Sequence, residues 1–254
     1  MRIKSSTESI SIRRVKMRLI VIGLGGIGTQ LLHPLMQYLN YEGKDLFDEI
    51  MLLDGDVYEE RNASRQYFDS LGKKSEVTAE YYKNLYKLPI TYDTEYISRS
   101  NIGVYIKNYD VVLSGVDNNA TRLLLEEHAE KLDNITIISG GNDYWDGNVV
   151  ITQKRDGVYT TPKFSGLHPE ILSPKDHNPA DLSCDSEVKQ GEAQLGLVNA
   201  SVANFMRTAL LGLINNELTI HEVFVNCLTG GTTVKNNPLN EDKLQYEKLG
   251  LIRD

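Results

Sequence analysis

The chain has 254 residues, with 27 lysines and arginines against 35 aspartates and glutamates, so its formal net charge is −8. With 41% hydrophobic and 24% charged residues, this composition excludes disulfide-dense and fibrous proteins and indicates a globular protein with a substantial core. Because a negative surface repels phosphate groups and anionic lipids, binding to nucleic acid or a membrane would need a local basic patch. The only candidate is the short segment at residues 13–18, so we expect neither kind of binding.

The two cysteines, Cys184 and Cys227, lie far apart in the sequence. They provide neither a disulfide framework nor a CxxC pair of the kind that holds zinc. The most apolar early stretch, residues 19–22, is too short for a signal sequence or a membrane span. We therefore expect a cytoplasmic protein without a targeting segment.

Strand and helix patterns alternate from the start of the folded region. A β-branched run at residues 17–22 ends in the glycine-rich segment 23–28, after which apolar residues recur at helical spacing. Pro34 lies early in this helix, where proline costs least, and predicts a local irregularity. A second strand at residues 50–53 completes a βαβ unit, which predicts parallel strands joined by a right-handed crossover.

The alternation continues up to residue 138. The sequence predicts, in chain order, a helix at 81–88, an extended segment at 90–96, a buried strand at 110–113, a helix at 120–132 and a strand at 135–138. This order predicts a Rossmann-like α/β fold with a doubly wound, mostly parallel sheet.

After residue 140 the pattern changes to a C-terminal antiparallel extension. In chain order it consists of a strand at 147–152, a hairpin turn at 155–157, a crossover loop at 160–188, a helix at 190–214 and two strands at 222–226 and 232–234. The crossover loop is polar and too long for a passive connection, so we expect it to be functional. We interpret residues 1–254 as a single domain, with a nucleotide-binding core at 17–140 and the extension at 141–254.

The glycine-rich segment has the spacing Gly23-x-Gly25-x-x-Gly28 between a strand and a helix. This spacing lets backbone N–H groups at a helix N-terminus approach a phosphate closely. Asp54 ends the second strand, where a dinucleotide fold places the carboxylate that holds ribose hydroxyls. The two features favour an adenosine nucleotide but do not distinguish NAD from ATP, and a glycine-rich turn without a ligand is the alternative.

Three later segments do distinguish these nucleotides: 53–66 (LDGDVYEERNASRQ), 72–76 (GKKSE) and 115–122 (GVDNNATR). Together with the GxGGxG loop, their order resembles the ThiF/MoeB family, the adenylyltransferases related to ubiquitin-activating enzymes. The resemblance covers residues 19–122, extends at least to residue 152 and, more loosely, reaches residue 235.

The residue types also suit adenylation by themselves. Activation of a carboxylate requires neutralisation of a triphosphate and stabilisation of a transition state at its α-phosphorus. Arg65 and Lys74 supply positive charge, and Asn62 and Gln66 supply neutral polar contacts. Asp117 is a carboxylate of the kind that Mg²⁺ binds together with phosphate oxygens. Taken singly, each of these residues could instead be a surface charge or a helix cap.

The resemblance implies ATP and Mg²⁺ as cofactors. It implies that Asp54 holds the ribose, that Gly26 contacts the phosphates and that Asp117 binds the metal. The remaining implied site residues are Asn62, Arg65 and Lys74 at the triphosphate, and Gly23, Gly25, Gly28, Asp56 and Gln66 around the nucleotide. Lys73 is a near-equal alternative to Lys74, because the glycine spacing is one residue shorter here than in the family.

The resemblance also implies the substrate, namely the C-terminal glycine of a ubiquitin-like or sulfur-carrier protein ending in Gly-Gly, with release of pyrophosphate. A modified peptide or a small carboxylic acid is the alternative substrate. Two alternative functions are an NAD-dependent oxidoreductase and a non-catalytic nucleotide-binding module. An oxidoreductase would leave Asn62, Arg65, Lys74 and Asp117 unexplained. The apolar face of the helix at 190–214 and the family together suggest a symmetric homodimer, and packing of this face on the chain's own sheet is the alternative.

The sequence departs from the family in two ways. Many members bind a structural zinc through two CxxC pairs, but the corresponding segments 158–161 and 226–229 contain none, so we expect no zinc. Many members also extend an arginine from an N-terminal helix into the partner subunit's ATP site. Here residues 9–15 look extended, and we assign this role to neither Arg13 nor Arg14.

Cys184 is a candidate nucleophile for a second step. It lies at the end of the crossover loop, where thiol-using family members place a reactive cysteine, and a helix N-terminus stabilises a thiolate. The adjacent Asp185 opposes the thiolate, and an incidental cysteine is the alternative. We expect Cys227 to belong to the core, and His168 and His177 to be solvated.

Overall fold

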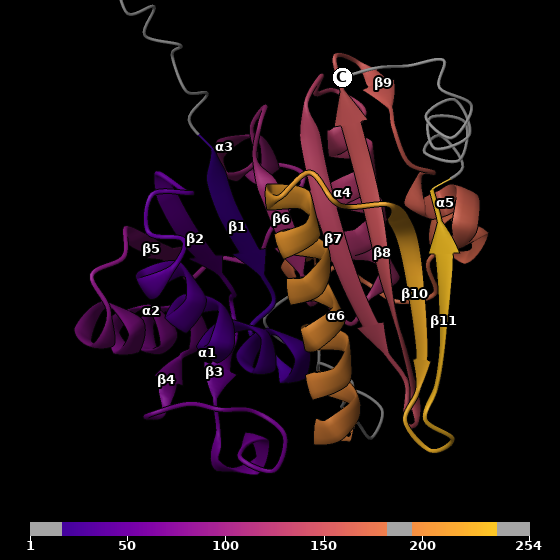
Figure 1. Ribbon diagram of the computed structural model, residues 1–254. Helices are drawn as coiled ribbons and strands as arrows, with labels where there is room; N and C mark the ends of the chain where they lie inside the picture. Colours follow the sequence, from indigo (N-terminus) through magenta and orange to yellow (C-terminus); the bar gives the residue numbers. More distant parts are fainter. Residues whose placement is uncertain (1–16, 182–194, 238–254) are drawn as a thin grey trace, which may run out of the picture.

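The computed structural model describes residues 17–181 and 195–237 (Figure 1). Within these ranges, nine strands form one mixed sheet in the order β11-β10-β8-β7-β6-β1-β2-β5, with β9 paired to β8. The strands with parallel neighbours are β1 (Arg18–Ile22), β2 (Glu49–Leu53), β5 (Ile90–Asp93), β6 (Val111–Ser114) and β7 (Ile135–Asn142). The antiparallel extension consists of β8 (Asp146–Arg155), β9 (Val158–Tyr159), β10 (Ile220–Asn226) and β11 (Gly231–Asn236).

Helices cover both faces of the sheet, as Figure 1 shows. The first face carries α1 (Gly26–Tyr41), α2 (Lys74–Leu85) and α6 (Gly196–Ile214), and the second carries α3 (Ile102–Tyr105) and α4 (Asn119–Ala129). Successive residues of β1 point to opposite faces, so Leu19 and Val21 join the first core and Ile20 and Ile22 the second. The predicted doubly wound, mostly parallel sheet with an antiparallel extension is confirmed.

Short elements complete the described chain. A small sheet of β3 (Val57–Tyr58) and β4 (Gly72–Lys73) lies outside the main sheet. The short helices are α5 (Phe164–Leu167), η1 (Glu60–Asn62), η2 (Pro169–Leu172) and η3 (Pro179–Asp181). Three of them lie within the described part of the predicted crossover loop, so residues 160–181 carry more local structure than their sequence pattern indicates.

The helix predicted at 81–88 is wrong in position, because α2 runs from Lys74 to Leu85. Its first two turns bury the polar residues Lys74, Ser75 and Thr78. A search for periodic apolar residues therefore misses them. Of the long helix predicted at 190–214, α6 accounts for Gly196–Ile214, and residues 190–194 lie outside the described ranges.

Pro34 lies inside α1 without ending it. Proline has no N–H, so the carbonyl of Gln30, four residues earlier, lacks its helical partner. Arg207 of α6 supplies the missing donor, since its Nη1 lies 2.8 Å from the Gln30 oxygen. Burial lowers the pKa of Arg207, but a guanidinium stays charged in proteins.

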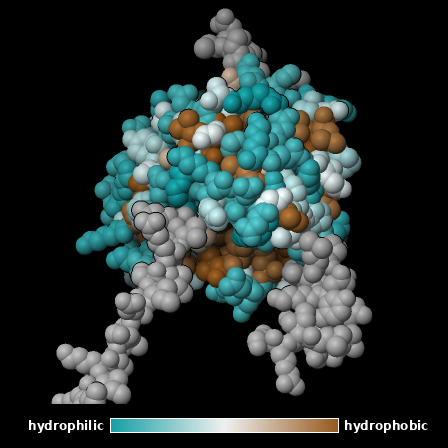
Figure 2. Space-filling view, turned by 90° about the horizontal axis from the view of Figure 1, so that it is seen from above, coloured by the Kyte–Doolittle hydropathy of each residue, from teal (hydrophilic) through white to brown (hydrophobic). Residues whose placement is uncertain are grey.

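By length and composition, α6 could cross a membrane, but it packs across β7, β8 and α1 as a core helix does. Its residues Val198, Val202, Met206 and Leu210 are fully buried against this chain's own core. The apolar face of α6 that suggested a homodimer thus packs against the core of its own chain. At the end where the parallel strands begin, hydrophobic patches interrupt a mostly hydrophilic surface (Figure 2).

Candidate active site

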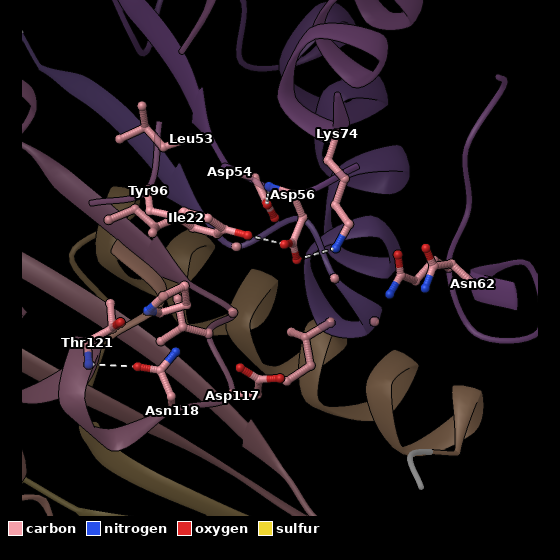
Figure 3. Close-up of a pocket in the computed structure, with 18 of the residues that line it drawn as sticks. Ile22, Leu53, Asp54, Asp56, Asn62, Lys74, Tyr96, Asp117, Asn118 and Thr121 are labelled. Atoms are coloured by element: carbon pink, nitrogen blue, oxygen red, sulfur yellow. Dashed lines mark hydrogen bonds and ion pairs between the residues drawn. The ribbon is translucent and has the colours of Figure 1, made fainter. Parts of the chain in front are cut away.

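A cavity of about 500 Å³ lies at the carboxyl ends of β1, β2 and β6 (Figure 3). The register places Ile22 beside both Leu53 and Ser114, so the three strands end together. In doubly wound sheets, ligands bind at this edge. The walls consist of the glycine loop, the segment after β2, Lys74 of α2, residues 95–97 and 115–118, Asn142, and Asn178–Pro179.

The glycines of the loop have different roles. Gly23 has a φ of +84°, which favours glycine, and a side chain on Gly28 would lie 2.1 Å from the Gly23 carbonyl oxygen. Gly28 is therefore needed for packing, and it does not line the cavity. Gly25 and Gly26 do line it, at the N-terminus of α1, where no acidic residue occupies the first turn. Their N–H groups are suitably placed for an anion.

Asp54 ties the glycine loop to β2. Its Oδ2 accepts a hydrogen bond from Leu24 N at 2.5 Å, and its Oδ1 accepts one from Asp56 N at 2.8 Å. Burial raises the pKa of Asp54, while nearby Lys74 acts in the opposite direction. The carboxylate also lines the cavity, so it can both fix the loop and face a ligand.

Lys74 and Tyr96 point toward Asp56 from opposite sides (Figure 3). Lys74 Nζ lies 2.9 Å from Asp56 Oδ2, and the Tyr96 hydroxyl donates to the other carboxylate oxygen. Burial raises the pKa of Tyr96, and Asp56 raises it further. Lys73 is exposed, binds Thr94 Oγ1 at 3.1 Å and does not line the cavity. Of the two lysines left open by the sequence, the structure places Lys74 at the site.

The segment around η1 supplies three more of the predicted residues. Asn62 is 8% exposed, and its Oδ1 accepts from Glu59 N at 2.9 Å. Arg65 Nε and Gln66 Oε1 are buried atoms with no hydrogen-bond partner in the described chain. An unpaired buried polar atom is costly, so both atoms suit a bound polar ligand.

The loop after β6 presents Asp117 to the cavity. Asn118 is the N-cap of α4, since its side chain accepts from Thr121 N at 2.8 Å. Behind the loop, Arg122 Nη2 donates to the carbonyl of Val116 at 3.0 Å. No group of three or more potential metal ligands occurs in the described residues. Asp117 alone still suits Mg²⁺, which binds through one or two carboxylates together with phosphate oxygens.

The crossover loop contributes a wall that the sequence patterns did not indicate. Asp176 accepts hydrogen bonds from Asn119 N and Ala120 N, both at 2.8 Å, and so covers the N-terminus of α4. Asn178 Nδ2 donates to the carbonyl of Ile97 at 3.0 Å and lines the cavity. These bonds join residues 50 or more positions apart, which no local motif reveals.

The expectation that His168 is solvated is wrong. Its Nε2 lies 2.6 Å from Oε1 of Glu222, which is completely buried, and Lys235 Nζ lies 2.7 Å from the other carboxylate oxygen. The buried carboxylate thus has a charged or hydrogen-bonding group on each side. The two partners come from the crossover loop and β11, so sequence spacing could not reveal them. His177 is exposed, as expected.

The profile of the ThiF family matches residues 9–247, which is most of the chain. The chain belongs to the ThiF family. Of the site residues that the resemblance implied, those in the described ranges line the cavity, apart from Gly28, which lies behind the wall.

Named relatives support this ThiF assignment. The probable adenylyltransferase/sulfurtransferase MoeZ of Mycobacterium tuberculosis is 26% identical over 204 residues, which cover 78% of this chain and 47% of MoeZ. The SAMP-activating enzyme E1 of Haloferax volcanii is 29% identical over 167 residues, which cover 64% of this chain and 57% of that protein. The chain thus spans about half the length of these relatives.

Solved structures agree on the fold. MccB of E. coli with ATP has a TM-score of 0.63 and 16% identity, covering 87% of this chain and 63% of MccB. MccB with AMPCPP and MccA has a TM-score of 0.62, with 16% identity and coverage of 87% and 63%. At such identities, the likeness shows the ThiF-type fold alone.

The two segments that the sequence comparison matched with the family's zinc-binding pairs lie at opposite ends of β8. Tyr159 pairs with Lys154, whereas Asn226 pairs with Asp146, eight residues earlier in β8. At about 3.4 Å per residue, this separation is about 27 Å. Two pairs that bind one zinc cannot lie so far apart, so the match of residues 158–161 and 226–229 with those pairs is wrong.

The two cysteines differ in what the structure says of them. Cys184 lies outside the described residues, so its proposed role is a prediction. Cys227 is partly buried against the main core, as expected. Its Sγ lies 3.5 Å from the Ser201 hydroxyl of α6.

Proposed function

We propose that this ThiF family protein activates a carboxylate by adenylation. A carboxylate oxygen of the substrate attacks the α-phosphorus of ATP, an acyl-adenylate forms and pyrophosphate leaves. The observation that carries the proposal is the convergence of Arg65, Lys74 and Asp117 on the cavity beside the N-terminus of α1. Such a combination of cations, a carboxylate and a helix N-terminus serves phosphoryl chemistry.

The cavity has an apolar end and a polar end. Ile22, Leu53, Ile97 and Val116 line the apolar part, which suits a purine base. Asp54 lies next to it and can accept hydrogen bonds from ribose hydroxyls. The phosphates are then directed toward Gly25 and Gly26, Arg65 and Lys74.

Lys74 forms an ion pair with Asp56 and can exchange this partner for a phosphate oxygen. Asn62 and Gln66 can donate their amide N–H groups to phosphate oxygens. Mg²⁺, held at Asp117, would neutralise phosphate charge and stabilise the transition state. Arg65 can hold the charge that develops on the α-phosphate as pyrophosphate leaves.

For the substrate, we propose the C-terminal glycine of a ubiquitin-like or sulfur-carrier protein. The names of the similar relatives, an adenylyltransferase/sulfurtransferase and a SAMP-activating enzyme, support a protein substrate. We further propose that the protein works as a homodimer. We also propose that the Cys184 thiolate attacks the acyl carbon of the adenylate to form a thioester while AMP leaves, or that Cys184 takes part in sulfur transfer.

ATP–pyrophosphate exchange with a panel of carrier proteins ending in Gly-Gly tests the proposal. We expect exchange that depends on one carrier and on its free C-terminal carboxylate. A protein that binds ATP but gives no exchange with any carrier or peptide would instead be a nucleotide-binding module. Binding of NAD in preference to ATP in a calorimetric titration would also contradict the proposal.

A further inference from the structure

The turn between β7 and β8 exposes four consecutive residues, Asp143, Tyr144, Trp145 and Asp146. The two aromatic rings lie 5.2 Å apart at an interplanar angle of 87°. A backbone hydrogen bond of 2.8 Å from Asp143 N to the carbonyl of Asp146 closes the turn. Aromatic rings held at the surface of an ordered turn add little to the fold, and such residues are enriched in binding surfaces.

The turn is fixed to its neighbours. Cys227 N donates to the carbonyl of Trp145 at 2.8 Å, so the turn lies beside the connection between β10 and β11. The adjacent Leu228 is 64% exposed. Ser201 contacts Cys227, and Leu197, one helical turn earlier in α6, is 55% exposed. We call these exposed residues the mouth patch: Tyr144, Trp145, Leu197 and Leu228.

The turn that carries Tyr144 and Trp145 directly follows a residue of the active-site cavity. Asn142, the last residue of β7, lines the cavity and directly precedes the turn. Its Nδ2 is a buried donor without a hydrogen-bond partner in the described residues. A chain that runs from the patch into the cavity passes this donor, which can then bind an oxygen of the entering group.

Charge indicates what the patch binds. Asp143 and Asp146 flank the two aromatic rings, and the whole chain carries a net charge of −8. Carboxylates beside exposed aromatic faces attract lysine and arginine side chains through ion pairs and cation–π contacts. An acidic tail would be repelled by the same groups.

We propose that the mouth patch binds the C-terminal tail of a polypeptide substrate that carries lysine or arginine a few residues before its reacting carboxylate. Asn142 donates to the acyl end of this tail as it enters the cavity. The inference rests on the proposed adenylation and narrows its substrate to a polypeptide with a basic tail, rather than a small carboxylic acid.

Trp145 is the only tryptophan of the chain, so its fluorescence reports directly on the patch. The probes are ten-residue peptides ending in Gly-Gly with a free carboxylate, one with two lysines before the glycines and one with two glutamates. We expect a saturable fluorescence change with the lysine peptide, an affinity about tenfold or more weaker for the glutamate peptide, and weaker binding of the lysine peptide at higher salt.

Two variants test the residues by calorimetry. Asp143→Asn combined with Asp146→Asn should abolish the preference for the lysine peptide, and Tyr144→Ala should weaken its binding about tenfold. The matched control combines Tyr41→Ala with Asp45→Asn, two exposed residues near the end of α1, and should bind like the unmodified protein.

Equal affinity for the two peptides, or unchanged affinity in the patch variants, would overturn the inference. So would tryptophan fluorescence that changes with protein concentration alone, because a second copy of the chain would then cover the patch. Carrier-dependent pyrophosphate exchange with an unaltered Michaelis constant in the patch variants would reject the patch and leave adenylation intact. If the protein binds the lysine peptide selectively but catalyses no ATP–pyrophosphate exchange, the proposed adenylation would be rejected and the patch kept.

Discussion

The parallel and antiparallel halves of the sheet build the site in different ways. In the parallel half, the glycine loop, Asp54 and Lys74 are fixed by bonds to nearby strand ends, and each belongs to a motif. In the antiparallel half, Asp176 and Asn178 fix the crossover loop through bonds to distant backbone groups, and Asn178 lines the cavity. The parallel half carries the nucleotide-binding motifs, which can be found from their sequence spacing. The antiparallel half adds the crossover loop, whose contacts depend on the folded chain.

The largest expected effect comes from the parallel half. Arg65→Ala or Asp117→Ala should reduce carrier-dependent pyrophosphate exchange by at least about 100-fold, because each removes a charge that serves the transition state. The melting temperature should change little. Arg61→Ala, an exposed cation beside the same cavity, is the matched control. Unchanged exchange in both site variants would refute the assignment of these residues.

An intermediate effect tests whether the antiparallel half holds the crossover loop in place. His168→Ala leaves the buried carboxylate of Glu222 with Lys235 as its remaining ion-pair partner and should cost about 1–3 kcal/mol of the free energy of unfolding. Because Asn178 lies on the same loop, the dissociation constant for ATP should also rise. His177→Ala, exposed on that loop, should change stability by less than about 0.5 kcal/mol. Equal stability of the two variants in urea would show that the buried pair does not hold the loop.

The smallest effect is a pH dependence at Asp54. Its pKa in the folded protein lies above the ordinary value of 3.8, so above that pH the folded state holds more protons than the unfolded chain. This contribution to stability is complete below the ordinary pKa and is lost as the pH rises through the raised pKa. Asp54→Asn removes it. We therefore expect the free energy of unfolding of the unmodified protein, measured in urea, to fall relative to that of the variant as the pH rises from 4. A constant difference, as expected for exposed Asp45→Asn, would contradict the raised pKa.

The sequence predicted the parts of this molecule that depend on local patterns. The βαβ unit, the glycine loop and the order of the nucleotide motifs follow from strand and helix periods and from residue spacing. The start of α2 was missed, because its first turns bury polar side chains such as Lys74 and Ser75.

The rest of the site depends on contacts between distant segments. Tyr96 binds Asp56, 40 positions away, and its ring packs on Gly55, where a side chain would lie 2.6 Å from it. His168 meets Glu222 across 54 positions. A tyrosine after a strand and a histidine in a loop carry no local signal of such contacts, so only the fold reveals them.

The link between Pro34 and Arg207 constrains how this protein can change over evolution. Proline at position 34 is tolerated because a guanidinium from another helix serves the orphaned carbonyl of Gln30. Loss of Arg207 should therefore be more harmful while Pro34 is present than after proline has been replaced by a residue with an N–H. The two positions are epistatic, and the order of substitution matters: a lineage can lose the proline first and the arginine later with little harm, but the reverse order passes through a weakened intermediate.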